Sequence, residues 1–458
     1  MEAKMRVLSA TAQIGYGFPV ESLQKGLSFK PDIICADAGS TDAGPYYLGT
    51  GTSFASRKSC KRDLSILIPA ALEAKIPLFI GSAGGAGGDA NVNMFLELIQ
   101  EISKEQNLKF SVGVVYCEQD KQMLKEQLHA GKIKSMGYFP ELTDDVIDNA
   151  DHSVGMMGTE VFMAAYEMGV DVVIAGRTSD TAIFASYPIA HGIDPGLAWH
   201  AAKLLECGAC STQEFNAGDT IMVTFYDDCF YVEPMNKNLH HTSTSVAAHS
   251  LYENGNPFHL YEPGGMINLE GCHFEAISDY KVKVTGSQFV PSDTTTIKLE
   301  AAQLVGYRTV SIMGTRDPVF ISRLDEVISL VRKTIDRRVY DLYNGTVKPE
   351  DYILNYKYYG KNAIMGDLEP EKENPHELGI VIDVVAKTQE IANSICQMAR
   401  TFTLHHDFPG RRCTAGNMAI AFSPSDAPWG PVYEFTMEHL LTVEDQLSVV
   451  RIVKKEFG

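Results

Sequence analysis

The chain of 458 residues has few positive charges and lacks long apolar runs. Its 39 Lys and Arg stand against 58 Asp and Glu, which gives a net charge of −19. Such a protein repels phosphate backbones and anionic membranes, so we expect neither nucleic acid nor a lipid surface as its partner. No uncharged apolar stretch reaches the roughly 18 residues that a membrane-spanning helix needs. The richest one, residues 153–176, is interrupted by acids.

Several chemical motifs are also missing. The nine cysteines are scattered, mostly inside apolar runs, which is typical of reduced thiols in the cytoplasm. Only Cys207 and Cys210 lie close together, and without a second pair at metal spacing two thiols at a helix end are favoured over a zinc site. Neither GxSxG nor a Walker lysine is present, which argues against a serine hydrolase and a nucleotide-dependent enzyme. No secretory signal is visible, so we expect a cytoplasmic protein.

The pattern of apolar residues predicts two domains. In residues 1–212, β-branched runs alternate with helical patterns of ten or more residues, which implies parallel pairing with right-handed crossovers. We therefore predict a doubly wound α/β domain with a mostly parallel sheet. In residues 213–458, several strand-like segments alternate as half-exposed antiparallel strands do, and residues 322–343 form a long amphipathic pattern. This predicts a second, α+β domain with a mixed or antiparallel sheet.

Three strand-to-loop junctions, residues 31–45, 77–89 and 170–181, end in Gly, Ser, Thr and Asp. Strand ends converge at one edge of an α/β sheet, and glycine lets the backbone approach a ligand, so these junctions predict a small-molecule site. At the first, Asp37 and Asp42 flank Ser40 and Thr41. The two acids could act as general acid and base with the hydroxyls binding substrate, or could cap the loop and form an Asx turn.

The other two junctions carry groups that suit an anion. The loop containing Ser82, Gly84 and Gly85 precedes a helix, whose free N–H groups could hold a carboxylate or phosphate. The third junction carries Arg177, whose planar guanidinium could bind a carboxylate through two N–H groups, with Thr178 and Ser179 beside it. Asp180 could then serve as acid or base. An ion pair between Arg177 and Asp180 that only shapes the loop is the alternative.

Two further groups lie in the second half. His241 could reach into a cleft as a general acid, although a structural histidine is the alternative. The spacing of His241 and His249 does not bring their rings together on a helix, so no metal is expected. Arg411, with Asn417 or Thr414, could hold the anionic end of a substrate, or could instead pair with carboxylates across a contact.

Six segments in order carry a family resemblance: residues 36–49, 81–88, 175–182, 240–258, 304–318 and 399–426. Together they resemble the acyclic terpene utilisation protein A family. The resemblance implies catabolism of branched acyclic carbon chains as acids or coenzyme A thioesters. It also implies a small partner protein, because many relatives carry a further C-terminal domain or have it as a separate chain.

These observations predict an enzyme of carboxylic-acid or acyl-CoA catabolism, most simply a lyase, hydratase or isomerase that moves a proton next to a carbonyl. A non-catalytic binding subunit that acts with a small partner protein is the alternative. The expected ligand is a small carboxylate or an acyl-CoA thioester, and no other cofactor is identified. A homo-oligomer is expected because most soluble oligomers are symmetric assemblies of one chain.

Overall fold

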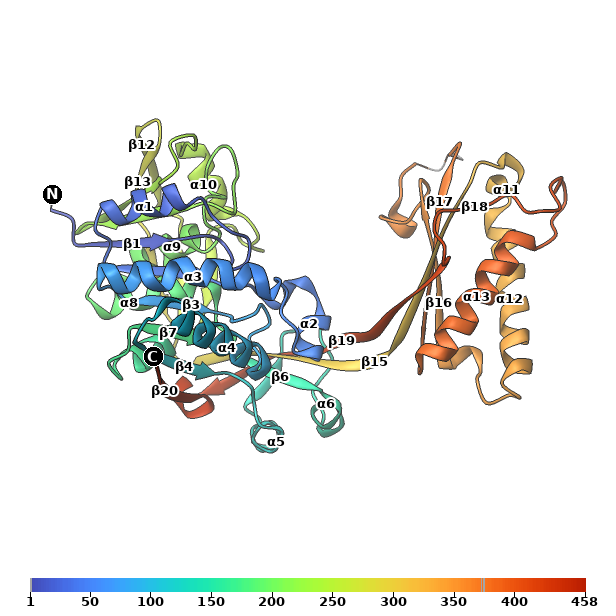
Figure 1. Ribbon diagram of the computed structural model, residues 1–458, viewed down its shortest axis with the longest axis horizontal. Coiled ribbons are helices and arrows are strands. Elements are labelled where there is room, and N and C mark those ends of the chain that lie inside the picture. The colour runs from blue at the N-terminus through green and yellow to red at the C-terminus, as the bar shows by residue number, and fades with distance from the viewer. Residues whose placement is uncertain (1, 372, 374) are drawn as a thin grey trace. The chain divides into compact units, whose positions relative to one another are not determined.

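The computed structural model describes residues 2–371, 373 and 375–458, which divide into two compact units (Figure 1). The described residues up to Gln303, with Phe435–Gly458, form the first, and the described residues of Leu304–Glu434 form the second. The grouping differs from the boundary expected near Thr212. Residues 213–303 belong to the first unit, and four of their strands, at 221–225, 229–234, 273–278 and 281–285, extend its sheet by antiparallel pairing.

The first unit contains a ten-stranded sheet whose centre is parallel, as the sequence predicts. The parallel strands, in spatial order, are β1 (Met5–Ser9), β2 (Ile33–Asp37), β3 (Leu78–Gly81), β7 (Val172–Ala175) and β4 (Phe110–Tyr116). Antiparallel strands flank them: β8 (Ile221–Phe225), β9 (Cys229–Pro234), β13 (Lys281–Thr285) and β12 (His273–Ser278) beside β1, and β20 (Arg451–Phe457) beside β4. The α/β class and the mostly parallel central sheet are confirmed.

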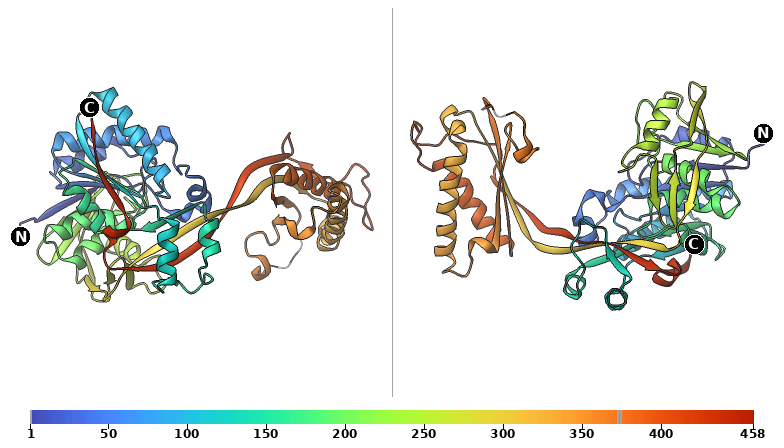
Figure 2. Two further views of the ribbon diagram at one scale, coloured as in Figure 1. Left: turned by 90° about the horizontal axis from the view of Figure 1, so that it is seen from below. Right: turned by 180° about the vertical axis from the view of Figure 1, so that it is seen from behind.

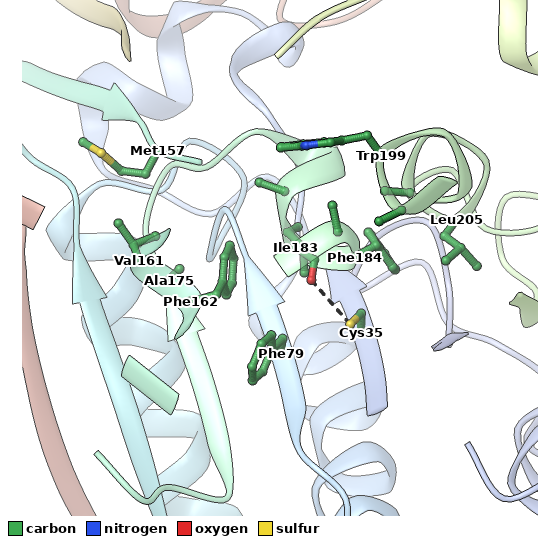
Figure 3. Packing of buried hydrophobic residues seen from close by; sticks show 14 of the residues in the cluster. Cys35, Phe79, Met157, Val161, Phe162, Ala175, Ile183, Phe184, Trp199 and Leu205 are labelled. Atoms are coloured by element: carbon green, nitrogen blue, oxygen red, sulfur yellow. Dashed lines mark hydrogen bonds between the residues drawn. The ribbon is translucent and has the colours of Figure 1, made fainter. Parts of the chain in front are cut away.

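Helices cover both faces of this sheet. One face packs against α1 (Val20–Ser28), α3 (Arg57–Ala74) and α4 (Asp89–Gln106), and the other against α7 (Glu160–Tyr166), α8 (Asp180–Ala190) and α9 (Pro195–Leu205). Figure 3 shows the second of these interfaces. Phe79 of β3 stacks on Phe162 of α7 with 5.6 Å between ring centroids, and the Cys35 thiol donates to the Ile183 carbonyl at 3.5 Å. The centre of the sheet is therefore buried on both sides, as near-continuous apolar strands require.

Smaller elements complete the first unit. They are α2 (Pro45–Thr50), α5 (Lys121–His129), α6 (Asp144–Asn149), α10 (Ser243–Leu251), β5 (Ile133–Ser135) and β6 (His152–Met156), with a three-stranded antiparallel sheet of β10 (His259–Glu262), β11 (Gly265–Asn268) and β14 (Gln288–Pro291). Two long strands, β15 (Thr295–Thr315) and β19 (Asp426–Val443), have residues in both units. In the first unit, β15 pairs with β6 and β19 pairs with β5.

The second unit is an antiparallel sheet with helices on one face (Figures 1 and 2). Its strands are β16 (Tyr352–Tyr359), β17 (Leu378–Ala386), β18 (Ala419–Ile420) and its share of β15 and β19, and its helices are α11 (Pro318–Ser322), α12 (Leu324–Leu342) and α13 (Gln389–His405). The apolar stripes of α12 and α13 pack on the buried face of the sheet. This agrees with an α+β region, and α12 coincides with the amphipathic pattern in the sequence. Across the described residues, no helix is both long and apolar enough to cross a membrane.

Candidate functional site

The loops that leave β3 and β7 form the candidate site. These strands are neighbours, but the chain continues from β3 into α4 on one face and from β7 into α8 on the other. In α/β proteins, ligands bind at the carboxyl ends of strands where the chain diverges in this way. Asp37 ends the adjacent strand β2, Ser82 follows β3 and Arg177 follows β7. The structure brings the last two together, since Arg177 Nη1 donates to Ser82 Oγ at 3.2 Å.

Arg177 is the centre of this region. Its side chain is only 6% exposed; Nε donates to Glu300 at 2.8 Å, and Nη1 donates to Asp180 at 3.1 Å. Nη1 also donates to the Thr178 carbonyl at 2.8 Å. Among the described residues, no hydrogen bond engages Nη2. Burial alone would lower the pKa of Arg177, but the charges of Glu300 and Asp180 outweigh it and raise that pKa.

Glu300 holds the guanidinium in place, and the sequence did not identify it. This carboxylate from β15 is 1% exposed and also accepts from Thr41 Oγ1 at 2.9 Å and from Lys298 Nζ at 3.0 Å. Burial would raise its pKa, but Arg177 and Lys298 lower it to about 2. Glu300 therefore stays ionised at neutral pH and fixes the orientation of Arg177. An acid inside a strand carries no local signal that its partner lies in a distant loop.

Asp37 and Asp180 have different surroundings although both face Arg177. Asp37 is 6% exposed and its Oδ1 has no hydrogen-bond partner among the described residues. Its pKa is raised well above the ordinary value, first by burial and then by the charge of Asp180. The Asp180 side chain is 35% exposed, and burial raises its pKa against the opposing effect of Arg177. The pair therefore favours a proton on the deeper Asp37 and leaves the more exposed Asp180 in contact with solvent.

Two glutamates that the sequence did not identify complete the arrangement. Burial raises the pKa of Glu206 to about 8, with a further contribution from Asp180, although Lys203 Nζ lies 2.6 Å from Oε1 of Glu206. Glu262 accepts from Ser179 Oγ at 2.6 Å, and burial raises its pKa as well. We call the whole group the strand-end cluster; it consists of Arg177, Lys203, Lys298, Asp37, Asp180, Glu206, Glu262 and Glu300.

The other predicted residues of the first junction have local roles. The Asp42 N–H donates to Ser40 Oγ at 3.2 Å, so the side chain that accepts in this turn is that of Ser40, and not that of Asp42 as in the Asx turn considered above. Asp42 is exposed, and its charge contributes to the raised pKa of Asp180, after burial. Thr41, by its bond to Glu300, links this turn to the strand-end cluster.

The glycine-rich loop meets Arg177 backbone to backbone. The Ser82 N–H donates to the Gly176 carbonyl at 2.9 Å, the Ala83 N–H donates to the Ala175 carbonyl at 3.0 Å, and the Arg177 N–H donates to the Gly87 carbonyl at 3.1 Å. At the start of α4, the Asp89 N–H donates to the Glu118 carboxylate at 3.2 Å. Gly84 and Gly85 have φ values of +70° and +104°. The loop thus uses several N–H groups internally, and a protein carboxylate occupies one that was expected to hold an external anion.

His241 lies apart from these hydrogen bonds. It is buried, its Nε2 is 2.9 Å from Ser211 Oγ, and burial lowers its pKa to about 3. A neutral imidazole in this setting favours the structural role that the sequence left open.

Arg411 and Asn417 belong to the second unit. The Arg411 guanidinium donates to carbonyls of its own loop, including Thr414 at 3.2 Å, and Asn417 hydrogen-bonds Asp317. Asn417 also lines a cavity of about 650 Å³ whose walls include Arg316 and Arg412. Arg412 rather than Arg411 therefore faces an open space. No group of three or more metal-ligating side chains is present in the described parts of the chain.

The fold and this geometry define a doubly wound α/β protein with a buried arginine among carboxyl groups of raised pKa at the strand ends. The family model described as acyclic terpene utilisation family protein AtuA matches residues 57–223 and 229–422, so the chain belongs to this family. The resemblance inferred from the six segments is thereby confirmed. No curated protein and no solved structure matches the chain.

Proposed function

We propose that the chain is an enzyme of carboxylic-acid or acyl-CoA catabolism, a lyase, hydratase or isomerase that moves a proton next to a carbonyl. The observation that carries this proposal is the convergence of carboxyl groups with raised pKa values on one arginine at the carboxyl ends of neighbouring strands. Groups with shifted pKa values gather where proton transfer is catalysed, because a catalytic acid or base needs a pKa near the working pH.

In this proposal Asp180 and Asp37 divide the proton transfer between them. Asp180 is the more exposed and lies 3.1 Å from a guanidinium that favours its ionised form, so it serves as the base. Asp37 is deeper and favours its protonated form, so it serves as the acid. Environments that push two neighbouring carboxyl pKa values apart are the usual means of assigning these roles.

Arg177 supplies the electrostatic part of the reaction. Glu300 and Asp180 engage its Nε and Nη1, which leaves Nη2 to donate to the oxygen of a substrate carbonyl. When the base removes a proton from the neighbouring carbon, negative charge develops on that oxygen, and a fixed cation in a buried setting stabilises it.

The test is exchange of substrate hydrogen with solvent, which does not require the product to be known. The purified chain is incubated in D₂O with a panel of short branched carboxylic acids and their coenzyme A thioesters, and deuterium uptake is measured by mass spectrometry. We expect uptake next to the carbonyl of at least one compound, and a loss of about a hundredfold or more in Asp37→Asn and Asp180→Asn.

Asp227→Asn is the matched control, because that carboxylate is 74% exposed and pairs with Lys4 on the surface. Exchange that continues unchanged in both active-site variants would refute the proposed roles. Loss in all three variants would point to a general defect and would equally count against the assignment.

A second candidate function is a non-catalytic subunit that binds a carboxylate or acyl-CoA and acts with a small partner protein. It is favoured by one observation: Asp37, Ser82 and Arg177 are absent from the walls of five cavities of about 480 to 890 Å³ that described residues line. Internal hydrogen bonds also occupy Ser82 and most of Arg177. A site closed in this way would open when a partner binds.

Thermal-shift measurements separate the two candidates. An enzyme competent alone is stabilised by its substrate without any other protein, whereas the subunit is stabilised only after a partner from the native host is added. Stabilisation by a thioester without a partner would remove the subunit from consideration. The nine free cysteines support a cytoplasmic setting in either case, and light scattering would determine whether the chain forms the proposed homo-oligomer.

A further inference from the structure

The largest of the five cavities noted above, of about 890 Å³, lies in the first unit. Its walls come from α1, from the end of β9 with the turn that follows, and from the β12–β13 hairpin. Pro234 at the end of β9 pairs with Ile221, which pairs with Ser9 at the carboxyl end of β1. The cavity therefore lies at the same edge of the sheet as the strand-end cluster. It is a separate site, because β8 and β1 lie between β9 and β2, and no member of the cluster lines it.

Apolar side chains form the floor of this cavity. Met235 is 6% exposed, Leu239 is 5% exposed, and Pro234 beside them is buried, so these lining residues lie at its bottom. Phe29 at the end of α1 and Tyr280 in the hairpin add two more accessible aromatic rings. Pockets of this volume hold small molecules mainly through apolar contact. The uncharged polar side chains of the walls are fewer: Ser22, Asn236 and Ser278.

The charged side chains of the walls leave an excess of positive charge. Lys281 lies 2.7 Å from Glu233, whose side chain is 8% exposed, so these two charges balance within the wall. Lys25 and Lys237 are exposed, and no described carboxylate lies within ion-pair distance of either. The remaining acid, Glu21, is exposed in the first turn of α1. Three lysines against two glutamates thus give the walls one net positive charge, in a chain whose net charge is −19.

The position of Lys25 joins this charge to the apolar surface. Its Nζ lies 4.6 Å from the centroid of the Phe29 ring, and both residues line the cavity. Lysine side chains commonly lay their methylene groups along apolar surface while the ammonium group stays in water. A ligand whose apolar part covers the floor would therefore place its other end beside exposed ammonium groups.

We infer that this cavity binds an anion with an apolar body, in which the body lies against Met235 and Leu239 and the negative charge meets Lys25 and Lys237. The inference does not depend on the proposed function, because it concerns binding outside the strand-end cluster and involves no reaction.

The test compares three probes: octanoate, octylammonium and butanoate. Their affinities for the full chain are measured at pH 7 by ligand-observed NMR. The net charge of the chain alone would favour octylammonium, whereas the cavity favours octanoate. We expect octanoate to bind saturably and at least about fivefold tighter than octylammonium, with an affinity that falls as added salt screens the charges. Butanoate should bind at least about tenfold more weakly than octanoate, because its shorter chain buries less apolar surface.

Charge changes at the walls locate the anionic end of the ligand. Lys25→Glu and Lys237→Glu should each weaken octanoate binding by about threefold or more. Glu21→Gln removes the acid that has no ion-pair partner among the described residues, so it should strengthen that binding. Lys333→Glu is the matched control, because this lysine is exposed on α12 in the second unit, and the affinity should stay unchanged.

Two variants of the hairpin locate the apolar body. Ser278→Trp adds a large ring at an exposed position of the wall and should weaken octanoate binding at least about tenfold. Ile277→Trp adds the same ring at the neighbouring position, which is 47% exposed and outside the lining, and should leave the affinity unchanged.

Several results would overturn the inference. Octylammonium that binds as tightly as octanoate would reject the preference for an anion, and so would an affinity for octanoate that salt does not change. Equal losses in Lys25→Glu and Lys333→Glu would assign the effect to the net charge of the chain. Octanoate binding that persists in Lys25→Glu, Lys237→Glu and Ser278→Trp would place the ligand elsewhere and reject this cavity, while deuterium exchange would still test the proposed function separately.

Discussion

Replacing Glu300 by Gln tests whether the ion pair with Arg177 holds the candidate site together. The substitution keeps the shape of the side chain and one acceptor oxygen but removes its negative charge. In the wild type this charge meets Arg177 Nε at 2.8 Å and Lys298 Nζ at 3.0 Å, and the carboxylate is 1% exposed. Without it, a nearly buried guanidinium retains only Asp180 as a charged hydrogen-bond partner.

Two lines of reasoning give the size of the effect. The pKa of Glu300 falls from 4.5 to about 2, which corresponds to about 3 kcal/mol of stability at pH 7. Removing one partner of a buried ion pair lowers the free energy of unfolding by about 3–5 kcal/mol. Because Gln keeps a hydrogen bond and Asp180 remains, we expect a loss of about 3 kcal/mol. Since a carboxylate with a lowered pKa stabilises above its unfolded pKa, the loss should shrink as the pH falls from 4.5 toward 2.

Tryptophan fluorescence can report on the first unit alone. The chain has two tryptophans, and Trp199 is 2% exposed in the core of the first unit, 6.0 Å from the Phe289 ring. Trp429 belongs to the second unit and is 62% exposed, so Trp429→Phe provides a background in which only Trp199 responds. In urea, a loss of about 3 kcal/mol moves the midpoint by about 1 M when the slope is about 3 kcal/mol per molar.

A double-mutant cycle with Arg177→Met makes the prediction specific. If the two groups act as a pair, the double variant should lose less than the sum of the single losses, with a coupling of about 1.5–3 kcal/mol. Glu97→Gln is the control, because its pair with Arg57 is exposed and is worth less than about 1 kcal/mol. A loss in Glu300→Gln no greater than in this control, or a coupling below about 0.5 kcal/mol, would refute the reasoning.

Three further predictions concern stability. Gly87→Ala should lose at least about 2 kcal/mol by urea denaturation, because its Cβ would lie 2.3 Å from the Arg177 nitrogen at φ +68°, whereas Gly137→Ala, with φ +94° and open space, should lose about 1 kcal/mol. The stability of His249→Phe relative to the wild type should rise by about 2 kcal/mol as the pH falls from 8 to 5. The wild-type imidazole has a pKa lowered from 6.5 to about 4, so it contributes stability that is present above pH 6.5 and is lost as the pH falls below it. A stability difference that does not change with pH would contradict this. Asp194→Ala should lower the melting temperature by removing the cap that accepts from the first turn of α9, a loss of about 1 kcal/mol, and an unchanged melting temperature would contradict it.

The class of fold follows from local patterns, but strand partners do not. The strands β1, β2, β3, β4 and β7 are short apolar runs separated by helical patterns, and such runs pair in parallel and are buried on both faces. The local sequence of the antiparallel strands β8 and β9 is equally compatible with the start of a new domain and with an extension of the existing sheet. Only the pairing of β8 with β1 decides, and that contact joins residues more than two hundred positions apart.

The candidate site was predictable where it depended on the ends of strands. Asp37, Ser82 and Arg177 follow buried runs directly, and the geometry of parallel sheets then brings them to one edge. Glu300 was not predictable, because its partner Arg177 lies 123 positions away and a lone acid inside a strand suggests an exposed position. The same holds for Glu206, whose shifted pKa results from burial and from charges brought by other elements.

The glycine-rich loop shows that a local pattern does not reveal which N–H groups are already engaged. The sequence places this loop at the start of α4, where free N–H groups attract an anion. In the structure, Glu118 from the segment after β4 accepts from the Asp89 N–H, and Asn91 accepts from the Gly88 N–H. No local pattern announces that a distant carboxylate will occupy the helix end.

The balance of charge in the strand-end cluster bears on the choice between the two candidate functions. Five carboxyl groups face three cations, so full ionisation would leave two buried negative charges without partners. Because an unpaired buried charge is costly, full ionisation of the cluster is disfavoured, which is what the raised pKa values of Asp37 and Glu206 express. A purely structural ion pair needs no such surplus, since one carboxylate for each cation would suffice. Proton transfer instead requires carboxyl groups with raised pKa values, and here they lie beside a partly exposed Asp180 and an unengaged Nη2 of Arg177. The surplus of carboxyl groups therefore favours the enzyme over the binding subunit.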